Sequence, residues 1–306
     1  MMQSKFFSNL LRRCDQRGFS SIKNLLVKTT DRIQQLHEQN GEITGISSGF
    51  SDLDLKTSGL QPADLIIVAG RPSIGKTSFA MNIAENVALN SDMPVAVFSM
   101  AMSSEALTMR MMSSLGGIDL HKIRTGNLDD NDQPHLESAI NILAETKLFI
   151  DDTPALTPSE IGSRSKRLIR EHGQLGLIVV DYLQLMQSPS SGDNRSLQIS
   201  DISHKLKALA KELNVPIIAV SQLNRNLEHR PNKRPILSDL QGSGAIEQNA
   251  DLILFIYRDE VYNENSRDIG IAEVIIGKQH NGPLGTVRLA FLGQYSRFEN
   301  LVCQYD

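Results

Sequence analysis

The sequence predicts an α/β fold in which a mostly parallel sheet is covered by helices on both faces. Six short apolar runs carry this prediction: LIIVAG (65–70), VAVFSM (95–100), KLFID (147–151), LGLIVVD (175–181), VPIIAVSQ (215–222) and DLILFIY (251–257). They lack the alternation of half-exposed strands, which indicates burial on both faces, and helical patterns separate the first five. The last part, AEVIIGKQ and GPLGTVRLAFL, instead predicts a C-terminal antiparallel hairpin joined through NGP.

Composition narrows the class of protein. The 306 residues leave room for one large α/β domain with a small appendage, or for two domains. No run approaches the roughly 20 uninterrupted apolar residues of a membrane span, so we expect a soluble, cytoplasmic protein with no membrane partner. The net charge of −4 means that any contact with nucleic acid depends on local clusters. Cys14 and Cys303 lack metal-type spacing and are expected to be inert thiols.

The amino-terminal part predicts two short segments before the main domain. Residues 1–18 are expected to be an extension or remnant; their basic character leaves open an organelle transit peptide, and with it an organelle-matrix location. Residues 19–42 predict an amphipathic linker helix followed by the polar break EQNGE. Its apolar stripe needs a cover, either a neighbouring subunit or its own domain. The main domain is expected to span residues 43–306.

The clearest chemical motif is GRPSIGKTS at 70–78, which fits G-x-x-x-x-G-K-[ST] between a strand and a helix. Gly70 and Gly75 let the backbone curl so that its amides point at phosphate oxygens. Lys76 supplies a charge for the β and γ phosphates, and the Thr77 hydroxyl is a candidate Mg²⁺ ligand. The predicted nucleotide-binding set is Gly70, Arg71, Pro72, Ser73, Ile74, Gly75, Lys76, Thr77, Ser78 and Asp181.

Two further strand ends complete the predicted site. Asp181 ends the run LGLIVVD, and beside a phosphate loop such an acid is expected to hold Mg²⁺, mostly through water. Without the loop, it would be read as an ordinary turn former. Gln222 ends AVSQ, where a neutral amide is suited to sense the γ-phosphate and relay a change to the next loop. The alternative for Gln222 is a polar strand terminus without a role.

Several blocks together resemble the motor domain of DnaB-type replicative DNA helicases: GRPSIGKTS, IRTGNLDD, IVVDYLQLM, LKALAKELNVPIIAVSQLNR, SDLQGSGAIEQNADL and GKQHNGPLG. The resemblance covers about residues 18 to 298. It implies a RecA-like core in a homo-hexameric ring, with ATP and Mg²⁺ between neighbours and single-stranded DNA in the channel. It also implies primase or helicase-loader contacts, although we expect almost nothing here of the N-terminal helical domain that family members usually carry.

The chain departs from the family pattern at three functional points. The family resembles S-L-E-M where this chain reads SMAM, so Ala101 stands where a glutamate would activate the attacking water. The family's K-Q-R-N-G, with its arginine finger, reads KQHNG here, which leaves His280 at the finger position and Lys278 as a remaining cation. The DNA-contacting D-L-R-E-S-G reads DLQGSG, in which Gln241 has lost a charge and the Gly242 and Gly244 amides remain.

These departures leave two main interpretations. One is an ATP-dependent DNA helicase motor whose hydrolysis is impaired by Ala101 and His280. The other is a non-enzymatic ATP-binding subunit that regulates, or co-assembles with, an active helicase. A recombination or kinase-type ATPase is disfavoured because AVSQLNR and SDLQGSGAIEQ fit the helicase pattern closely. Arg258, which follows DLILFIY, is a weaker candidate for a place near the nucleotide base.

Overall fold

The computed structural model describes residues 21–39, 43–188, 194–240 and 242–301. The chain divides into two units, residues 1–44 and 45–306, which are described separately. In the first unit, helix α2 (Ile22–Gln39) lies where the sequence predicts the amphipathic helix. Several of its apolar side chains, among them Ile22 and Ile33, are exposed. The predicted extension, residues 1–18, falls outside the described residues.

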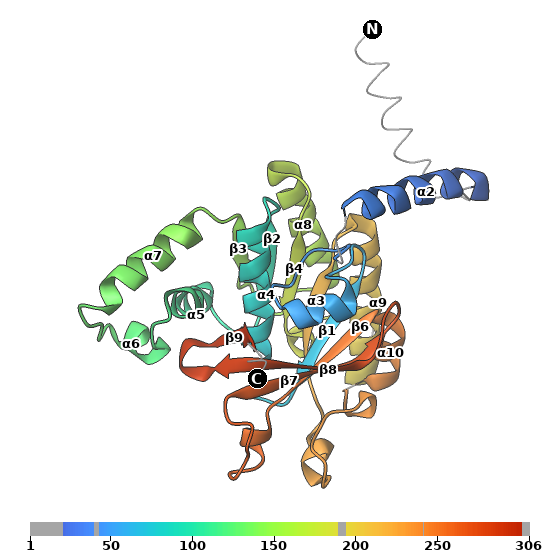
Figure 1. The fold of residues 1–306 in the computed structure, drawn as a ribbon. Helices are drawn as coiled ribbons and strands as arrows, with labels where there is room; N and C mark the ends of the chain where they lie inside the picture. Colours follow the sequence, from blue (N-terminus) through green and yellow to red (C-terminus); the bar gives the residue numbers. More distant parts are fainter. Residues whose placement is uncertain (1–20, 40–42, 189–193, 241, 302–306) are drawn as a thin grey trace. The chain divides into compact units, whose positions relative to one another are not determined.

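Within the described part of the second unit, nine strands form one sheet in the order β3-β2-β4-β5-β1-β6-β7-β8-β9 (Figure 1). Six of them run parallel: β1 (Leu65–Gly70), β2 (Val95–Ser99), β3 (Leu148–Asp151), β4 (Leu177–Asp181), β5 (Ile217–Gln222) and β6 (Leu252–Tyr257). Three antiparallel strands extend the sheet: β7 (Ile271–Gln279), β8 (Gly285–Leu292) and β9 (Arg297–Asn300). The predicted fold class is therefore confirmed, with β9 as an addition.

Helices cover both faces of this sheet. They are α3 (Ser51–Thr57), α4 (Lys76–Asn90), α5 (Ser104–Gly116), α6 (Leu120–Thr125), α7 (Asp132–Ala144), α8 (Pro158–His172), α9 (Arg195–Leu213) and α10 (Ser243–Asn249). Short 3-10 turns occupy Leu183–Leu185, Arg225–His229, Leu237–Asp239, Asp259–Val261 and Gly293–Tyr295. Among the described residues, no helix combines the length and apolarity needed to cross a membrane.

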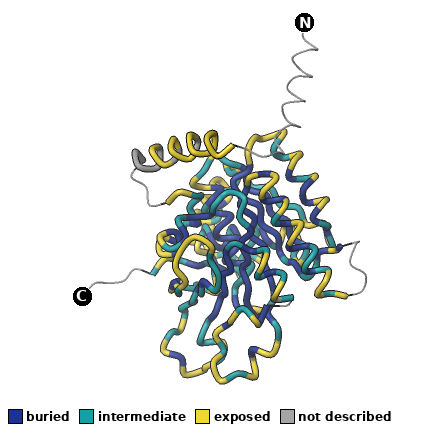
Figure 2. The backbone as a smooth tube through the Cα atoms, turned by 90° about the vertical axis from the view of Figure 1, so that its right-hand side faces the viewer, coloured by how far each residue is buried: buried dark blue, intermediate teal, exposed yellow. Residues whose placement is uncertain are grey.

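Alternate strand residues enter two separate cores, one on each face. Val68 of β1 packs in the core that contains Phe79 of α4, whereas its neighbour Ile67 packs in the core that contains Leu206 of α9. Figure 2 shows the resulting layer of buried strands between partly exposed helices. Burial on both faces explains why these strands read as continuous apolar runs.

The expectation that KLFID forms a fully buried strand is wrong. All four residues of β3 are only partly buried, in contrast to the fully buried β2 and β4. The reason is position, because β3 is the last strand at one side of the sheet and pairs only with β2. An edge strand keeps one hydrogen-bonding side and part of its faces in contact with water.

Candidate functional site

The phosphate-loop candidate joins β1 to α4 at the carboxyl edge of the parallel strands (Figure 1). Gly75, just before α4, has a φ of 107°, and a Cβ atom there would lie 2.9 Å from the Phe298 ring. Only glycine meets both demands without strain. Ser73 also has a positive φ, 59°. The loop is therefore tightly curled, and it leads directly into the amino terminus of a 15-residue helix, which favours an anion.

Thr77 and Asp181 meet at the centre of the site. The Thr77 hydroxyl donates to Asp181 Oδ2 over 2.8 Å, and only 3% of Asp181 is exposed. Burial raises the pKa of the Asp181 carboxyl, while the Thr77 hydroxyl and the charges of Lys76 and Arg110 act to lower it. A hydroxyl and a carboxylate are the hard oxygen donors that suit Mg²⁺. Because the described residues hold no cluster of three or more His, Cys, Asp or Glu ligands, the remaining Mg²⁺ ligands would be water or nucleotide oxygens.

Lys76 and Arg71 hold the loop in shape. The Lys76 ammonium donates to the Arg71 carbonyl over 2.8 Å, so its side chain folds back over the loop. Burial lowers the pKa of Lys76 to about 8, against the raising effect of Asp181. The Arg71 guanidinium binds Glu228 at 2.7 Å and the Leu223 carbonyl at 2.8 Å. The Arg71 side chain therefore anchors the loop to the segment after β5, and no motif marks Glu228 as its partner.

Gln222 lies next to the loop, because it pairs in register with Gly70 across β1 and β5. Its backbone amide donates to the side chain of Gln184 over 3.2 Å, and the Gln184 amide group donates to Ser221 over 3.0 Å. Gln184 follows Asp181 by three residues. The ends of β4 and β5 are thus tied together directly, through a residue that the sequence pattern does not single out.

Ala101 lies at the same edge of the sheet. Ser99, the last residue of β2, pairs with Asp181 of β4, and the Met100 amide donates to the Asp181 carbonyl over 2.8 Å. The chain then turns at Ala101, whose methyl group is exposed, and the Ser99 hydroxyl donates to the Met102 carbonyl over 2.7 Å to hold this corner. The structure therefore places Ala101 beside the Thr77–Asp181 pair with no acidic group of its own.

Helix α5, which follows this corner, contributes a functional candidate that the motifs do not include. Arg110 is half-buried, and its positive charge interacts favourably with Asp181. Burial lowers the pKa of Arg110 in the opposite sense. Glu105, in the first turn of the same helix, is exposed. The only sequence signal for Arg110 is a single cation in the apolar stretch MRMM.

Aromatic side chains adjoin the loop on another side. The Arg258 guanidinium lies 4.1 Å from the centroid of the Phe291 ring, and the Phe291 and Phe298 centroids are 4.7 Å apart. Phe298 also contacts Phe79 of α4 edge to face, at 5.3 Å. Arg258 and Phe291 therefore form a flat stack close to the loop, a surface suited to a planar ring.

Lys278 and His280 lie at the opposite edge of the sheet. The Lys278 ammonium donates to the Ala250 carbonyl over 2.6 Å, and His280 Nδ1 lies 3.2 Å from an Asp251 oxygen. Asp251 also accepts a hydrogen bond from the amide of Leu65, the first residue of β1. The length of β1, roughly 17 Å, separates this cluster from the phosphate loop. Within one chain, therefore, neither residue can reach the Thr77–Asp181 pair.

The candidate DNA-contacting segment lies just before α10. Gln241 is outside the described residues. Gly242 has a φ of 77°, and a Cβ atom at Gly244 would meet nothing within 4 Å, so this backbone is approachable. Leu240 forms an isolated bridge with Leu223, which follows Gln222. The segment is thus joined to the strand end beside the phosphate loop.

Comparisons with known proteins agree on one family. The family model described as "DnaB-like helicase C terminal domain" matches residues 45–300. The "Replicative DNA helicase DnaB" of Pasteurella multocida is 58% identical over 299 residues, and that of Haemophilus influenzae is 55% identical over 299 residues. Each alignment covers 96% of this chain and 64% of the relative, so the chain spans slightly less than two thirds of the length of these relatives.

Solved structures agree with this assignment. One structure of an isolated helicase-like ATPase domain superimposes with a TM-score of 0.89 at 38% identity, covering 93% of this chain and all of that one. "The Structure Of A DnaB-Like Replicative Helicase And Its Interactions With Primase" gives a TM-score of 0.85 at 37% identity, covering 97% of this chain and 71% of that chain.

Proposed function

The chain belongs to the family of DnaB-like helicase C-terminal domains, and from that premise we propose that it is a DNA helicase motor that binds ATP with Mg²⁺. The family predicted from the sequence motifs is thereby confirmed. The motor proposed here spans residues 43–306, preceded by the linker helix of residues 19–42 and by an extension of residues 1–18. The observation that carries the proposal is the 2.8 Å contact between Thr77 and Asp181 beside a curled phosphate loop.

Binding of ATP follows from groups that already converge. The amides of the loop and the amino terminus of α4 attract the phosphates. Lys76, freed from the Arg71 carbonyl, would bind the β and γ phosphates, and their negative charge would restore its pKa toward the ordinary range. Mg²⁺, held by Thr77 and Asp181, would neutralise charge on the phosphate oxygens. The Arg258–Phe291 stack would receive the base.

Hydrolysis is where the chain falls short of its family. A carboxylate at residue 101 would polarise the attacking water, and a methyl group cannot do so. General-base catalysis of this kind contributes ~10²–10⁴ in rate. His280 and Lys278 lie too far away to act within their own subunit, so any role in hydrolysis requires a neighbouring copy whose site they enter. Gln222 would sense the γ-phosphate and pass a change through Leu223 to the DNA-contacting segment.

A ring supplies that neighbour. We propose a homo-hexamer, or co-assembly with a related helicase, in which the backbone around Gly242 and Gly244 contacts single-stranded DNA in the channel. The exposed apolar stripe of α2 would be covered by a neighbouring subunit. A primase or a helicase loader is a further proposed partner, and the similar helicase solved for its interactions with primase supports the first of these.

One observation favours a second function, a non-enzymatic ATP-binding subunit that regulates an active helicase. The groups that hold nucleotide are intact and mutually bonded, whereas the exposed corner at Ala101 lacks an acid. The deciding experiment measures ATP turnover with and without single-stranded DNA on protein of known oligomeric mass, together with the affinity for a fluorescent ATP analogue. Several turnovers per second would establish the motor, whereas tight binding without turnover would establish the regulatory subunit. Failure to bind the analogue in the presence of Mg²⁺ would refute both.

A further inference from the structure

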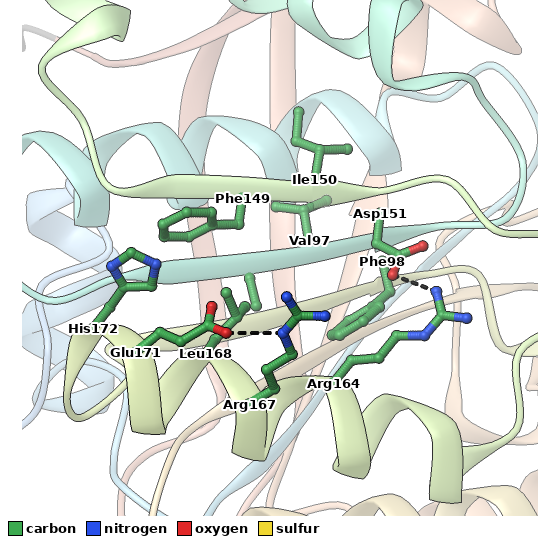
Figure 3. A pocket seen from close by; sticks show the side chains of 11 residues that line it. Val97, Phe98, Phe149, Ile150, Asp151, Arg164, Arg167, Leu168, Glu171 and His172 are labelled. Atoms are coloured by element: carbon green, nitrogen blue, oxygen red, sulfur yellow. Dashed lines mark hydrogen bonds and ion pairs between the residues drawn. The ribbon is translucent and has the colours of Figure 1, made fainter.

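A groove runs along the outer side of the sheet, between strand β3 and helix α8, well away from the phosphate loop. Its volume is about 430 Å³, which lies in the range of sites that hold ligands. We call it the edge groove. The residues that line it come from β2, β3 and α8: Ala96, Val97, Phe98, Phe149, Ile150, Asp151, Arg164, Arg167, Leu168, Glu171 and His172 (Figure 3).

One side of the edge groove is an open strand. β3 bonds to β2 along one edge, and along its other edge it has no strand partner among the described residues. Backbone amides and carbonyls at such an edge are able to pair with another extended chain. The partial burial of all four β3 residues shows that no helix in the described part of the chain closes over this strand.

The floor and the mouth of the groove differ in chemistry. Phe98 and Leu168 form an apolar floor, and Phe149 packs against His172 with ring centroids 4.6 Å apart at one end. At the other end Arg164 reaches from α8 to Asp151 of β3. Figure 3 shows Arg167 between these two ends, with its head toward the groove. The groove thus offers apolar depth with cationic donors at its mouth.

The arginine at the centre keeps donors available. Arg167 is 73% exposed, and it binds Glu171 through Nε at 2.8 Å. A guanidinium carries five N–H donors, so the two terminal nitrogens of Arg167 face the groove without a hydrogen bond to any other described residue. Exposed ion pairs of this kind contribute little to stability, so an incoming carboxylate would meet little competition.

We propose that the edge groove binds an extended segment of a partner protein, which adds to β3 as a further strand. An aliphatic or aromatic side chain of that segment lies on Phe98 and Leu168, and an acidic side chain binds Arg167. The spacing supports this occupant, since alternate residues of an extended chain point the same way, about 6–7 Å apart. An apolar residue and an acid two positions apart therefore meet the floor and the arginine together. Binding at the edge groove is independent of nucleotide binding and of turnover.

The charge pattern argues for an acidic segment rather than for a second copy of this chain's own edge. Helix α8 carries Arg164, Lys166, Arg167 and Arg170, although the whole chain has a net charge of −4. Two such surfaces placed face to face would bring cation against cation. Peptide recognition by strand addition uses main-chain hydrogen bonds for affinity and side-chain pockets for specificity, and both are present here.

The test uses the full chain and a phage-displayed library of random twelve-residue peptides. We expect enrichment of peptides with an apolar and an acidic residue two positions apart. The strongest of these, synthesised with a fluorophore, should bind the wild type and lose about tenfold or more in affinity to Arg167→Glu, as expected when a paired charge is reversed. Arg170→Glu is the matched control, because it changes the same charge on the same helix outside the groove, and its affinity should stay within about twofold.

Hydrogen exchange supplies the second measurement, because strand addition protects backbone amides. The bound peptide should slow exchange in residues 148–151 and leave the phosphate loop unchanged. The inference is overturned if no peptide is enriched, if both charge reversals weaken binding equally, or if the selected peptides bind without protecting β3. A change of oligomeric mass in Arg167→Glu would equally overturn it, because the groove would then be an interface between copies.

Discussion

Placing a carboxylate at residue 101 should reveal how much of the hydrolytic machinery remains. Ala101 follows Met100, whose amide is bonded to the Asp181 carbonyl, so its Cα atom lies at most roughly 8 Å from that of Asp181. The methyl group is exposed, so Ala101→Glu should fold normally. Restored general-base catalysis should raise turnover by ~10²–10⁴, a barrier change of about 3–5 kcal/mol.

Electrostatics at this corner favour such a base. At an effective dielectric constant near 20, two carboxylates ~8 Å apart repel by about 2 kcal/mol, which raises the pKa of the new glutamate. Lys76 and Arg110 act in the opposite direction, so the group should still be ionised near neutral pH. Its pH–rate profile should therefore show an acidic limb that the wild type lacks.

The assay is phosphate release at saturating Mg²⁺ and ATP, with single-stranded DNA present, on samples of matched oligomeric mass. Because His280 stands where the family carries an arginine, Ala101→Glu is compared alone and together with His280→Arg. The matched control is Ala101→Gln, which has the same shape but no charge. If the double variant binds ATP, keeps its mass and gains no more turnover than the glutamine control, the account of Ala101 as a lost base is wrong.

Metal binding, nucleotide affinity and folding give three more measurable consequences of these contacts. Thr77→Ala should weaken nucleotide binding about tenfold in Mg²⁺ but leave it unchanged in EDTA, since the hydroxyl acts through the metal; Ser73→Ala is the control, and an equal loss in EDTA would contradict this. Because the pKa of Lys76 is about 8 without ligand and phosphate raises it, nucleotide affinity should fall as pH rises above 8, with proton uptake on binding measurable by calorimetry in two buffers; a flat profile would count against it. Glu85 is buried, and burial raises its pKa to about 7 despite hydrogen bonds from Ser114 and Asn82. The folded state then holds more protons than the unfolded state between about pH 4.5 and 7, so stability should fall as pH rises through that window, by ~3 kcal/mol at most, and Glu85→Gln should lose this dependence in urea unfolding at pH 5 and pH 8.

The sheet is predictable from sequence because its central strands are buried on both faces. Continuous apolar runs betray such strands without knowledge of their neighbours, and all six are present. Strand β9, RFEN, cannot be recognised in this way, because Phe298 is its only apolar residue and its pairing depends on β8. The partial exposure of β3 escapes prediction for a related reason. Its sequence is as apolar as that of an inner strand, and only the strand order makes it an edge.

The site divides in the same way. The phosphate loop and Asp181 can be located from motif and strand-end position, because both requirements are local to the chain. Glu228 cannot, since it meets Arg71 across 157 residues of sequence, and nothing local marks either residue as a partner. Arg110 is comparable, because its contribution depends on α5 folding back toward the end of β4. Contacts of this kind follow from topology, which the sequence pattern specifies only in outline.

The same division explains how such a chain can lose turnover without losing its fold. Thr77, Asp181 and Arg71 are bonded to partners within the subunit, so replacing any of them would leave a buried polar group unsatisfied, at a cost of about 1–3 kcal/mol. Ala101 and His280 lie at exposed positions, where substitutions usually change stability by less than about 0.5 kcal/mol. Selection for folding and nucleotide binding therefore protects the first group and leaves the second free to change. An inactive member of this family should melt like an active one, and only turnover separates the two.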